Sequence, residues 1–422
     1  MESKDLNPSG VGPETRATGK SGIFRGVRRR RNAWIAVLVA GILLVAAYGT
    51  YVELTLGGCP GTGTSSDHTL VVDVYPSFMG SGSDPAAARD AVFGAFANAT
   101  GSHVVVNNIS GEDVATAVSQ ASSCSRPDIV IGVDEVTTEA LGTEGFLIPY
   151  APPALSQVNA TLVQDLSPQH YATPYEFGYL GLDYLTAFNN STSGQLGRSD
   201  FFQALVQNSS LASNFSYENP TQSIVGKEFL LWEYEFYTQV LHQNWTTFWS
   251  GAGPHLGTAF PDWTDGISAF GPSNDANLTC VPRCYPMFVS YSTDPAYYAT
   301  YPPGFSMNTT FAWYNGSAYT WETIYGVGIV RAPGENLTLA EKFVDWMLGP
   351  QVQSLVPLNE WEYPANGSIP VPPVYRVNPA SSDLVVLNGK TTPLAISQEL
   401  TGLLLEWQKL MAATGSGSSG AG

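Results

Sequence analysis

Positive charge is scarce in this chain beyond its first residues. The 422 residues include 18 lysines and arginines against 36 aspartates and glutamates, and the formal net charge at pH 7 is −18. Residues 1–32 hold eight of the basic residues and three of the acidic ones, so the rest of the chain carries 10 basic and 33 acidic side chains. Nucleic acids and anionic membrane surfaces attract basic surfaces. The composition therefore excludes both as partners of the part after residue 32.

Histidine, cysteine and the common catalytic motifs are also scarce or missing. The chain has five histidines and four cysteines. It contains no Gly-x-Ser-x-Gly elbow, no Walker-type phosphate loop, no dinucleotide fingerprint and no His-Glu-x-x-His pair. We therefore expect a protein that is not an enzyme and that needs no cofactor or resident metal.

The four cysteines are compatible with an oxidising compartment. Cys280 and Cys284 enclose Val-Pro-Arg, and we expect them to close a small disulfide loop. Cys59 and Cys124 form a second disulfide in one interpretation, whereas Cys59 carries a lipid in another. A zinc site at the close pair is disfavoured because no histidine lies near it.

An uncharged stretch follows the basic N-terminus. No residue between Arg31 and Glu53 is charged and most of them are apolar, which is the length that crosses a bilayer core. Because basic flanks stay on the cytoplasmic side, we expect a cytosolic arm at 1–32, a single-pass transmembrane anchor at 33–52 and a linker at 53–67. The rest would then face the outside. The alternatives are a cleaved signal peptide and lipidation at Cys59.

Glycosylation sequons support this outward orientation. Thirteen Asn-x-Ser/Thr sequons occur, where about four would be expected by chance from this much asparagine. The excess is typical of a glycosylated surface protein, and an archaeal cell surface fits best. The sequon asparagines are Asn98, Asn108, Asn159, Asn189, Asn190, Asn208, Asn214, Asn244, Asn277, Asn308, Asn315, Asn336 and Asn366.

Strand-like apolar runs alternate with helical patterns from residue 70 onward. Strands are expected at 70–75, 103–107, 128–133 and 178–184, and helices at 85–97, 112–121, 226–242 and 339–347. This alternation predicts an α/β fold with mainly parallel sheets, in which ligands bind beyond the carboxyl ends of strands. About 345 residues exceed what one core usually covers, so two lobes are expected.

One segment carries most of the functional information. Residues 290–298 read Ser-Tyr-Ser-Thr-Asp-Pro-Ala-Tyr-Tyr and follow the apolar run at 287–289. They place hydroxyl groups, a carboxylate and tyrosine rings at a strand end, before a helix that Pro295 can begin and that Ser, Thr or Asp can cap. A polar strand end beside flat aromatic faces suits an aromatic or cationic small molecule.

Eight short motifs follow one another between Leu70 and Lys409. They are Val74-Tyr75-Pro76-Ser77-Phe78, Asp128-Ile-Val-Ile-Gly-Val-Asp134, Pro174-Tyr-Glu-Phe-Gly-Tyr179, Asn219-Pro-Thr-Gln-Ser223, Leu231-Trp232, the segment from Ser290 to Tyr297, Asn359-Glu-Trp-Glu-Tyr-Pro364 and Glu406-Trp-Gln408. In this order they resemble the thiamine-binding type of extracellular solute-binding protein, which feeds ABC importers.

The resemblance implies a two-lobed α/β periplasmic-binding-protein fold of the type II-like class, with a hinge and with the transmembrane helix before it. Lobe 1 would comprise residues 68–177 and 318–390, and lobe 2 residues 178–317 and 391–412, followed by a flexible tail at 413–422. It also implies a receptor that closes around its ligand and presents it to a separate ABC permease and ATPase complex.

The same resemblance implies a ligand site between the lobes for thiamine or thiamine phosphate. Tyr75, Tyr297 and Trp361 would flank the rings through stacking and cation–π contacts worth about 1–2 kcal/mol each. Glu176 would accept a hydrogen bond from the aminopyrimidine. The residues expected at the hydroxyethyl or phosphate end are Gly132, Asp134, Ser223, Trp263 and Tyr291, with Asp294 beside them.

Three departures from the family pattern favour free thiamine over its phosphates. Pro76 replaces an aspartate, Gln222-Ser223-Ile224 replaces Thr-Ser-Thr, and Asp294 replaces a serine. The second change removes two hydroxyl groups from the expected phosphate corner, and the third adds a charge that would repel phosphate. The segment 271–286 resembles an insertion.

Several of these residues have simpler interpretations. Tyr297 and Trp361 are alternatively core aromatics, Asp134 and Ser223 helix caps, and Glu176 a solvated hinge carboxylate. The Tyr297-Tyr298 pair also resembles the adjacent tyrosinate ligands of ferric-binding relatives. The alternative functions are a receptor for ferric iron or another small organic cation, and a glycosylated surface protein without a transport role.

Overall fold

The computed structural model describes residues 68–109, 113–192, 196–197, 199–272, 283–332, 336–388 and 392–414. All of them belong to one compact unit, Gly63–Gly422. The predicted arm, anchor and linker at 1–67 lie outside the described residues, as does the predicted tail beyond residue 414. Among the residues that are described, no helix is long and apolar enough to span a membrane.

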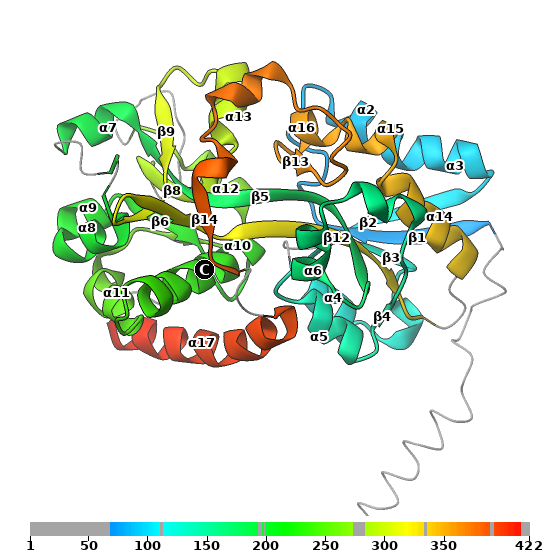
Figure 1. The fold of residues 1–422 in the computed structure, drawn as a ribbon, viewed down its shortest axis with the longest axis horizontal. Helices are drawn as coiled ribbons and strands as arrows, with labels where there is room; N and C mark the ends of the chain where they lie inside the picture. Colours follow the sequence, from blue (N-terminus) through cyan, green and yellow to red (C-terminus); the bar gives the residue numbers. More distant parts are fainter. Residues whose placement is uncertain are drawn as a thin grey trace, which may run out of the picture. The chain divides into compact units, whose positions relative to one another are not determined.

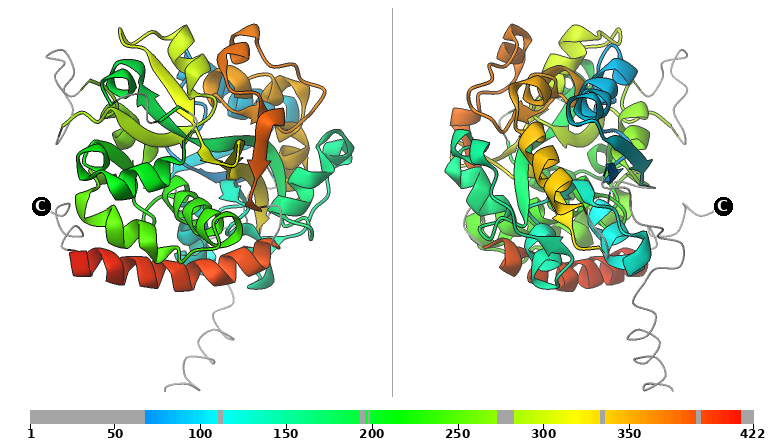
Figure 2. Two further views of the ribbon diagram at one scale, coloured as in Figure 1. Left: turned by 60° about the vertical axis from the view of Figure 1, so that its left-hand side comes forward. Right: turned by 90° about the vertical axis from the view of Figure 1, so that its right-hand side faces the viewer.

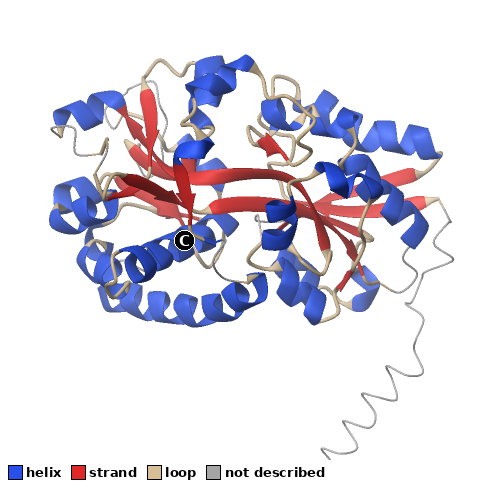
Figure 3. Ribbon diagram, in the orientation of Figure 1, coloured by secondary structure: helices blue, strands red, loops and turns tan. Residues whose placement is uncertain are grey.

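A mixed sheet of eleven strands lies at the centre of the described chain, with helices on both of its faces (Figures 2 and 3). Its main strand order is β2-β1-β3-β12-β5-β8-β6-β7, and β10, β11 and β14 form a second, small sheet. The strands are β1 (Thr69–Val74), β2 (His103–Asn108), β3 (Ile129–Asp134), β4 (Leu147–Ile148), β5 (Ala172–Leu185), β6 (Phe215–Glu218), β7 (Ala259–Phe260), β8 (Met287–Tyr291), β9 (Met307–Thr310), β10 (Ala312–Tyr314), β11 (Ser317–Thr320), β12 (Glu322–Val330), β13 (Tyr363–Pro364) and β14 (Leu384–Val386).

Two long strands, β5 and β12, connect the two halves of the sheet (Figure 1). β12 pairs antiparallel with β3 and with β5, and β5 pairs antiparallel with β8. The outer strands do pair in parallel, as β1 does with β2 and β3, and β6 with β7 and β8. The prediction of mainly parallel sheets is therefore wrong for the connecting strands, which return across the sheet in the opposite direction.

Helices pack on the sheet. The helices are α2 (Pro85–Arg89), α3 (Ala95–Thr100), α4 (Val114–Gln120), α5 (Thr138–Thr143), α6 (Ala160–Leu166), α7 (Thr186–Ser191), α8 (Phe201–Gln207), α9 (Ser209–Ala212), α10 (Ile224–Glu235), α11 (Thr246–Gly251), α12 (Trp263–Ser268), α13 (Asp294–Thr300), α14 (Leu337–Met347), α15 (Pro350–Gln353), α16 (Val356–Asn359) and α17 (Pro393–Thr414). The helix expected at 85–97 is α2 and α3 joined by the π-helical turn Asp90–Gly94.

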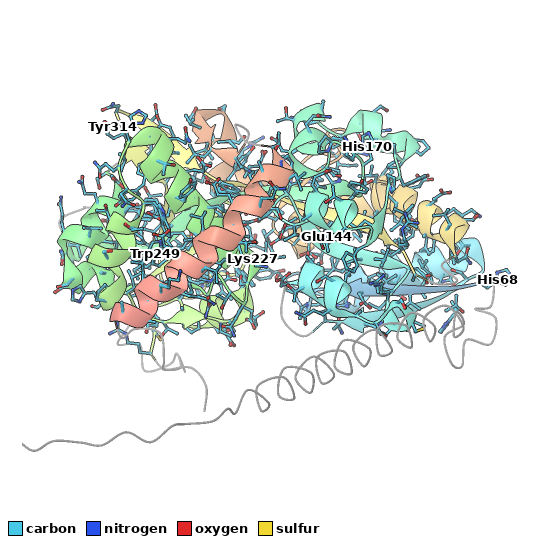
Figure 4. The ribbon with its side chains drawn as sticks, turned by 90° about the horizontal axis from the view of Figure 1, so that it is seen from below. His68, Glu144, His170, Lys227, Trp249 and Tyr314 are labelled. Carbon is cyan, nitrogen blue, oxygen red and sulfur yellow. The ribbon has the colours of Figure 1, made fainter. Side chains whose placement is uncertain are left out.

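The two cores are the physical basis of two lobes. One core contains β1, β3 and residues such as Phe96 and Phe343, and the other contains β8 and residues such as Trp232 and Trp249. β5 enters both, since Tyr175 packs in the first core and Leu182 in the second. α17 packs on α10 and α11 and also contacts α5 of the first lobe; Figure 4 shows it crossing the lower face. The exact lobe boundaries stay a prediction.

The described cysteines are consistent with the predicted oxidising compartment. Cys124 and Cys284 are both disulfide-bonded, and neither is a free thiol. Cys59 and Cys280 lie outside the described residues, so the predicted pairing stays a prediction. Asn277 lies outside them as well.

Asn366 is a sequon asparagine that the fold uses internally. It is 1% exposed, and its Nδ2 donates hydrogen bonds to Gln157 Oε1 and to the Leu348 carbonyl. Its Oδ1 accepts from the backbone N–H and the hydroxyl group of Ser368. A glycan on Nδ2 would break this network, so the prediction of a glycosylation site is wrong at this position.

Asn366→Asp is expected to lower the free energy of unfolding by about 1–3 kcal/mol, because a carboxylate would face two carbonyl acceptors. Thermal or urea unfolding measures the change. Asn98→Asp is the control, since Asn98 is exposed and its variant should match the wild type. Equal stability of both variants would contradict the network's role.

Candidate functional site

A cavity that is partly open to solvent, with about 600 Å³ of empty space when the open solvent is included, is lined by residues at the ends of β1 and β8, within β5, in α13 and in the α16–β13 segment. Residues of both cores contribute to it, Tyr75 and Tyr325 from the first and Tyr291 from the edge of both. The lining residues are Tyr75, Ser77, Ser81, Glu176, Ile224, Trp263, Tyr291, Asp294, Tyr297, Tyr325, Glu360, Trp361 and Glu362.

Seven of the ten predicted site residues line this cavity, namely Tyr75, Glu176, Trp263, Tyr291, Asp294, Tyr297 and Trp361. Six further residues line the cavity and were not predicted as site residues, namely Ser77, Ser81, Ile224, Tyr325, Glu360 and Glu362. Three of these lie within quoted motifs: Ser77 in the first, and Glu360 and Glu362 beside Trp361. Tyr325 had no local signal, because it lies within a continuous buried strand.

The other three predicted residues lie next to the cavity and have structural contacts. Asp134 accepts hydrogen bonds from the N–H groups of Val136 and Thr137, at 3.0 and 2.7 Å, and so holds the turn before α5. Ser223 is the N-cap of α10 and accepts from the Gly226 N–H at 3.2 Å. Ser223 is therefore the helix cap of its simpler interpretation, whereas Asp134 holds a turn and does not cap α5, whose N-cap is Thr137.

One wall of the cavity is built around the Tyr75 ring. The ring stacks on Tyr325 with centroids 5.8 Å apart. Its hydroxyl group lies 2.7 Å from the Tyr175 hydroxyl, 3.1 Å from Glu176 Oε1 and 3.2 Å from Glu360 Oε2. A single phenol therefore orients two carboxyl groups at one side of the cavity.

The Tyr75 ring has room only because residue 132 is glycine. A Cβ atom at Gly132 would come within 2.4 Å of the ring, and the residue has φ of +100°. Glycine adopts this left-handed region at little cost, whereas other residues are strained there. Gly132 thus acts on the site through Tyr75.

Trp361 and Tyr297 form the opposite aromatic wall. Their ring centroids are 5.4 Å apart at 79°. Trp361 is 3% exposed, donates from Nε1 to the Ser81 carbonyl at 3.0 Å, and stacks on Tyr375. It also has φ of +61°, which costs about 1–3 kcal/mol for a bulky residue and is typical of functional sites.

Tyr291 and Trp263 close a third side. Tyr291 ends β8, and its hydroxyl group lies 2.9 Å from that of Tyr325. Trp263 begins α12 and donates from Nε1 to Ser290 Oγ at 3.0 Å. α13 begins at Asp294 with Thr293 as N-cap, and no side chain caps it. The prediction of a side-chain cap here is therefore wrong.

Four carboxyl groups line the cavity, and none of the lining residues that the structure describes is a lysine or arginine. Burial raises the pKa of Glu176 to about 8. Burial first, and then neighbouring carboxylates, raise the pKa of Glu360 and Glu362 well above the usual range. Burial also raises the pKa of Asp294. Glu176 is 1% exposed, so its interpretation as a solvated carboxylate is wrong.

The adjacent tyrosines Tyr297 and Tyr298 do not act together at the cavity. Tyr297 lines it, whereas Tyr298 packs with Phe270 and Phe305 in a separate cluster. Across the described parts of the chain, no group of three or more His, Cys, Asp or Glu residues is arranged to hold a metal ion.

Residues of both cores thus line one cavity, which is partly open to solvent. No family model matches the chain. It is 25% identical over 261 residues to the thiamine-binding periplasmic protein of Brucella abortus, which covers 61% of this chain and 68% of that protein. A solved periplasmic thiamin binding protein superposes with a TM-score of 0.65 at 19% identity, covering 84% of this chain and 99% of that one.

Iron-bound HitA from Pseudomonas aeruginosa has the same fold, with a TM-score of 0.58 at 17% identity, over 81% of this chain and 99% of that one. The resemblance inferred from the motifs is therefore confirmed. The chain has the two-lobed α/β fold of type II-like periplasmic binding proteins. It is a solute-binding receptor of the kind that serves ABC importers, and it is not an enzyme.

Proposed function

We propose that this receptor binds thiamine and delivers it to an ABC permease and its ATPase. The observation that carries the proposal is the combination of aromatic walls with three buried carboxyl groups and a fourth, half-buried one at Glu360, while no lysine or arginine is among the described residues that line the cavity. Thiamine joins an aminopyrimidine to a permanently charged thiazolium. Aromatic faces attract such cations and stack on flat rings, and the relatives named above bear thiamine in their names.

In this proposal Tyr75, Tyr297 and Trp361 contact the two rings. Glu176 accepts from the amino group of the pyrimidine, since its Oε2 has no hydrogen-bond partner and lines the cavity. The polar tail of the ligand lies toward Tyr291 and Trp263. Asp134 and Ser223 contribute by holding the turns behind the site.

We also propose that the two lobes close around the ligand. Lobe 1 comprises residues 68–177 and 318–390, and lobe 2 comprises residues 178–317 and 391–412. The hinge would be formed by β5 and β12, which cross between the cores. Closure around a ligand is the usual motion of such receptors.

Residues 33–52 would tether the receptor to the outer face of the membrane. The uncharged run between Arg31 and Glu53 and its basic flank support this tether.

Titrating the purified full-length chain with thiamine, while tryptophan fluorescence is followed, tests the proposal. Saturable binding at micromolar thiamine is expected. Trp361→Ala should weaken binding about 10- to 100-fold, because it removes a desolvated aromatic face. Trp407→Ala is the control, since Trp407 is similarly buried but packs in the second core.

The control variant should lose stability without losing affinity. Equal weakening by both substitutions would mean that Trp361 is only a core residue. An absence of binding in the wild type would favour a surface protein without a transport role.

Ferric iron is the second candidate, favoured by the iron-bound protein of the same fold. Adding ferric citrate in the same assay distinguishes the two ligands. A coloured complex, together with loss of that colour in Tyr297→Phe, would support iron and exclude thiamine as the main cargo.

A further inference from the structure

Glu362 is a buried carboxyl group at the cavity wall. Its side chain is 4% exposed and lines the cavity, and neither carboxylate oxygen has a hydrogen bond of normal geometry, although the hydroxyl group of Thr293 lies close enough to favour the ionised form. Its Oε2 lies where a Cβ atom of Gly178 would be, at 1.8 Å from that position. The Glu362 carboxylate can therefore occupy this position only because Gly178 has no side chain.

Further carboxyl groups surround Glu362, and no lysine or arginine is among the described residues that line the cavity with it. Glu176 Oε2 and Asp294 Oδ2 are also buried without partners, and both residues line the same cavity. Arg89 lowers the pKa of Glu360 but is not among the residues that line the cavity. Burying carboxylates without a partner is costly, because water no longer solvates them.

Aromatic faces lie directly beside this carboxyl group. Trp361 precedes it in the chain and packs edge to face on Tyr297. A flat cation placed against these rings would meet the carboxyl group of Glu362 and the hydroxyl-bearing end of β8. The geometry therefore offers one ligand both ring contact and a counterion.

We propose that Glu362 is the counterion of a flat, permanently charged organic cation, and that it determines the preference of the cavity for a cation over a neutral or anionic ligand. The choice of thiamine as the test cation rests on the proposed function. The sequence resemblance assigned no role to Glu362. The inference rests on its burial, its lack of a hydrogen bond of normal geometry and its position at the cavity wall.

Cation binding at the Glu362 carboxyl group is linked to the release of a proton. The groups that act on Glu362 are the carboxyl groups of Glu176, Asp294 and Glu360, which raise its pKa further after burial has done so, and the hydroxyl group of Thr293, which lowers it. The tyrosines whose pKa values Glu362 in turn raises are Tyr179, Tyr291, Tyr363 and Tyr375. Burial and these carboxyl groups therefore favour the protonated form of Glu362 in the empty cavity.

A bound cation favours the ionised carboxyl group, so binding releases a proton to the solvent. Affinity for thiamine should therefore rise as the pH is raised. The phosphate of thiamine monophosphate would instead bring negative charge toward the same carboxyl groups.

Calorimetric titration of the full-length chain, in buffers of different ionisation enthalpy, measures affinity and proton release together. For the wild type we expect about one proton released per thiamine near pH 7, and weaker binding of thiamine monophosphate. Glu362→Gln should lower thiamine affinity about 10- to 100-fold at pH 8 and reduce proton release, because the amide cannot ionise. Glu362→Asp should restore part of both.

The matched control is Glu233→Gln. Glu233 is fully buried but lies at Trp249 in the second core, where its Oε2 accepts from Trp249 Nε1 at 2.9 Å. This variant should bind thiamine as the wild type does. If wild type and Glu362→Gln bind thiamine equally and release equal numbers of protons, the counterion role is wrong while the proposed function stands. If the wild type binds no thiamine, the proposed function itself fails.

Discussion

Gly132→Ala is expected to lower the free energy of unfolding by about 3–5 kcal/mol and to abolish measurable thiamine binding. Two effects add at this position. The backbone has φ of +100°, which strains any residue with a side chain, and the new methyl group would lie 2.4 Å from the Tyr75 ring. The ring fills the space behind the cavity wall and orients Glu176 and Glu360. Displacement of the Tyr75 ring therefore disturbs both the ligand site and the packing of the core.

Gly101→Ala is the control that introduces backbone strain without a steric clash. Gly101 has φ of +64°, but nothing lies within 4 Å of the added Cβ atom. Chemical denaturation should show a loss of about 1 kcal/mol, and thiamine titration should show no change in affinity. If Gly132→Ala behaved like Gly101→Ala in both measurements, the close contact between Gly132 and Tyr75 would not matter for the site.

The ends of the strands were predictable from sequence because local pattern determines them. The apolar run before Tyr75 and the run before Asp134 became β1 and β3 at nearly the expected bounds. The aromatic residues of the cavity were found through motif order, since each lies at or near such an end. What local pattern could not give was the direction of β5 and β12, whose pairing depends on partners more than a hundred residues away.

The electrostatic character of the cavity was harder to predict. Glu360 and Glu362 alternate with Trp361 and Tyr363, and such alternation ordinarily indicates an exposed charged edge. In the structure the positive φ of Trp361 turns this segment, and both Trp361 and Glu362 are buried. Asp134 differs in the other direction. This carboxylate at the end of a strand was expected to contact the ligand, but it instead accepts hydrogen bonds from the turn that follows it.

A second group of buried carboxyl groups lies behind the cavity, at the point where the two cores meet. Glu135 accepts hydrogen bonds from Trp321 Nε1 at 2.7 Å and from the Ile324 N–H at 2.9 Å. Burial, followed by the charge of Asp134, raises its pKa to about 8. Burial, followed by the charges of Glu135 and Asp134, raises the pKa of Glu228 well above the usual range. Neighbouring carboxyl groups of this kind share protons when the chain is folded.

The folded protein is accordingly expected to be most stable in mild acid and to lose stability as the pH rises toward 8. A carboxyl group with a raised pKa in the folded chain binds more protons folded than unfolded. Its stabilising contribution is complete below the unfolded pKa of 4.5 and disappears as the pH rises through about 8. With Glu176 showing the same shift, the free energy of unfolding should fall by roughly 1–3 kcal/mol per pH unit between these limits.

Thermal unfolding of the ligand-free chain at about pH 5, 6, 7 and 8 measures this slope. Glu228→Gln should flatten it and raise the melting temperature at pH 8, because its amide oxygen can still accept from Thr323 while the repulsion of Glu135 is lost. Glu144→Gln, at an exposed position, should leave the slope unchanged. Thiamine should raise the melting temperature more at pH 8 than at pH 5, since a cation compensates the carboxylates that ionise there. A melting temperature that rises from pH 5 to 8 would mean that these carboxyl groups are ionised in the folded chain and that their charge is balanced within it.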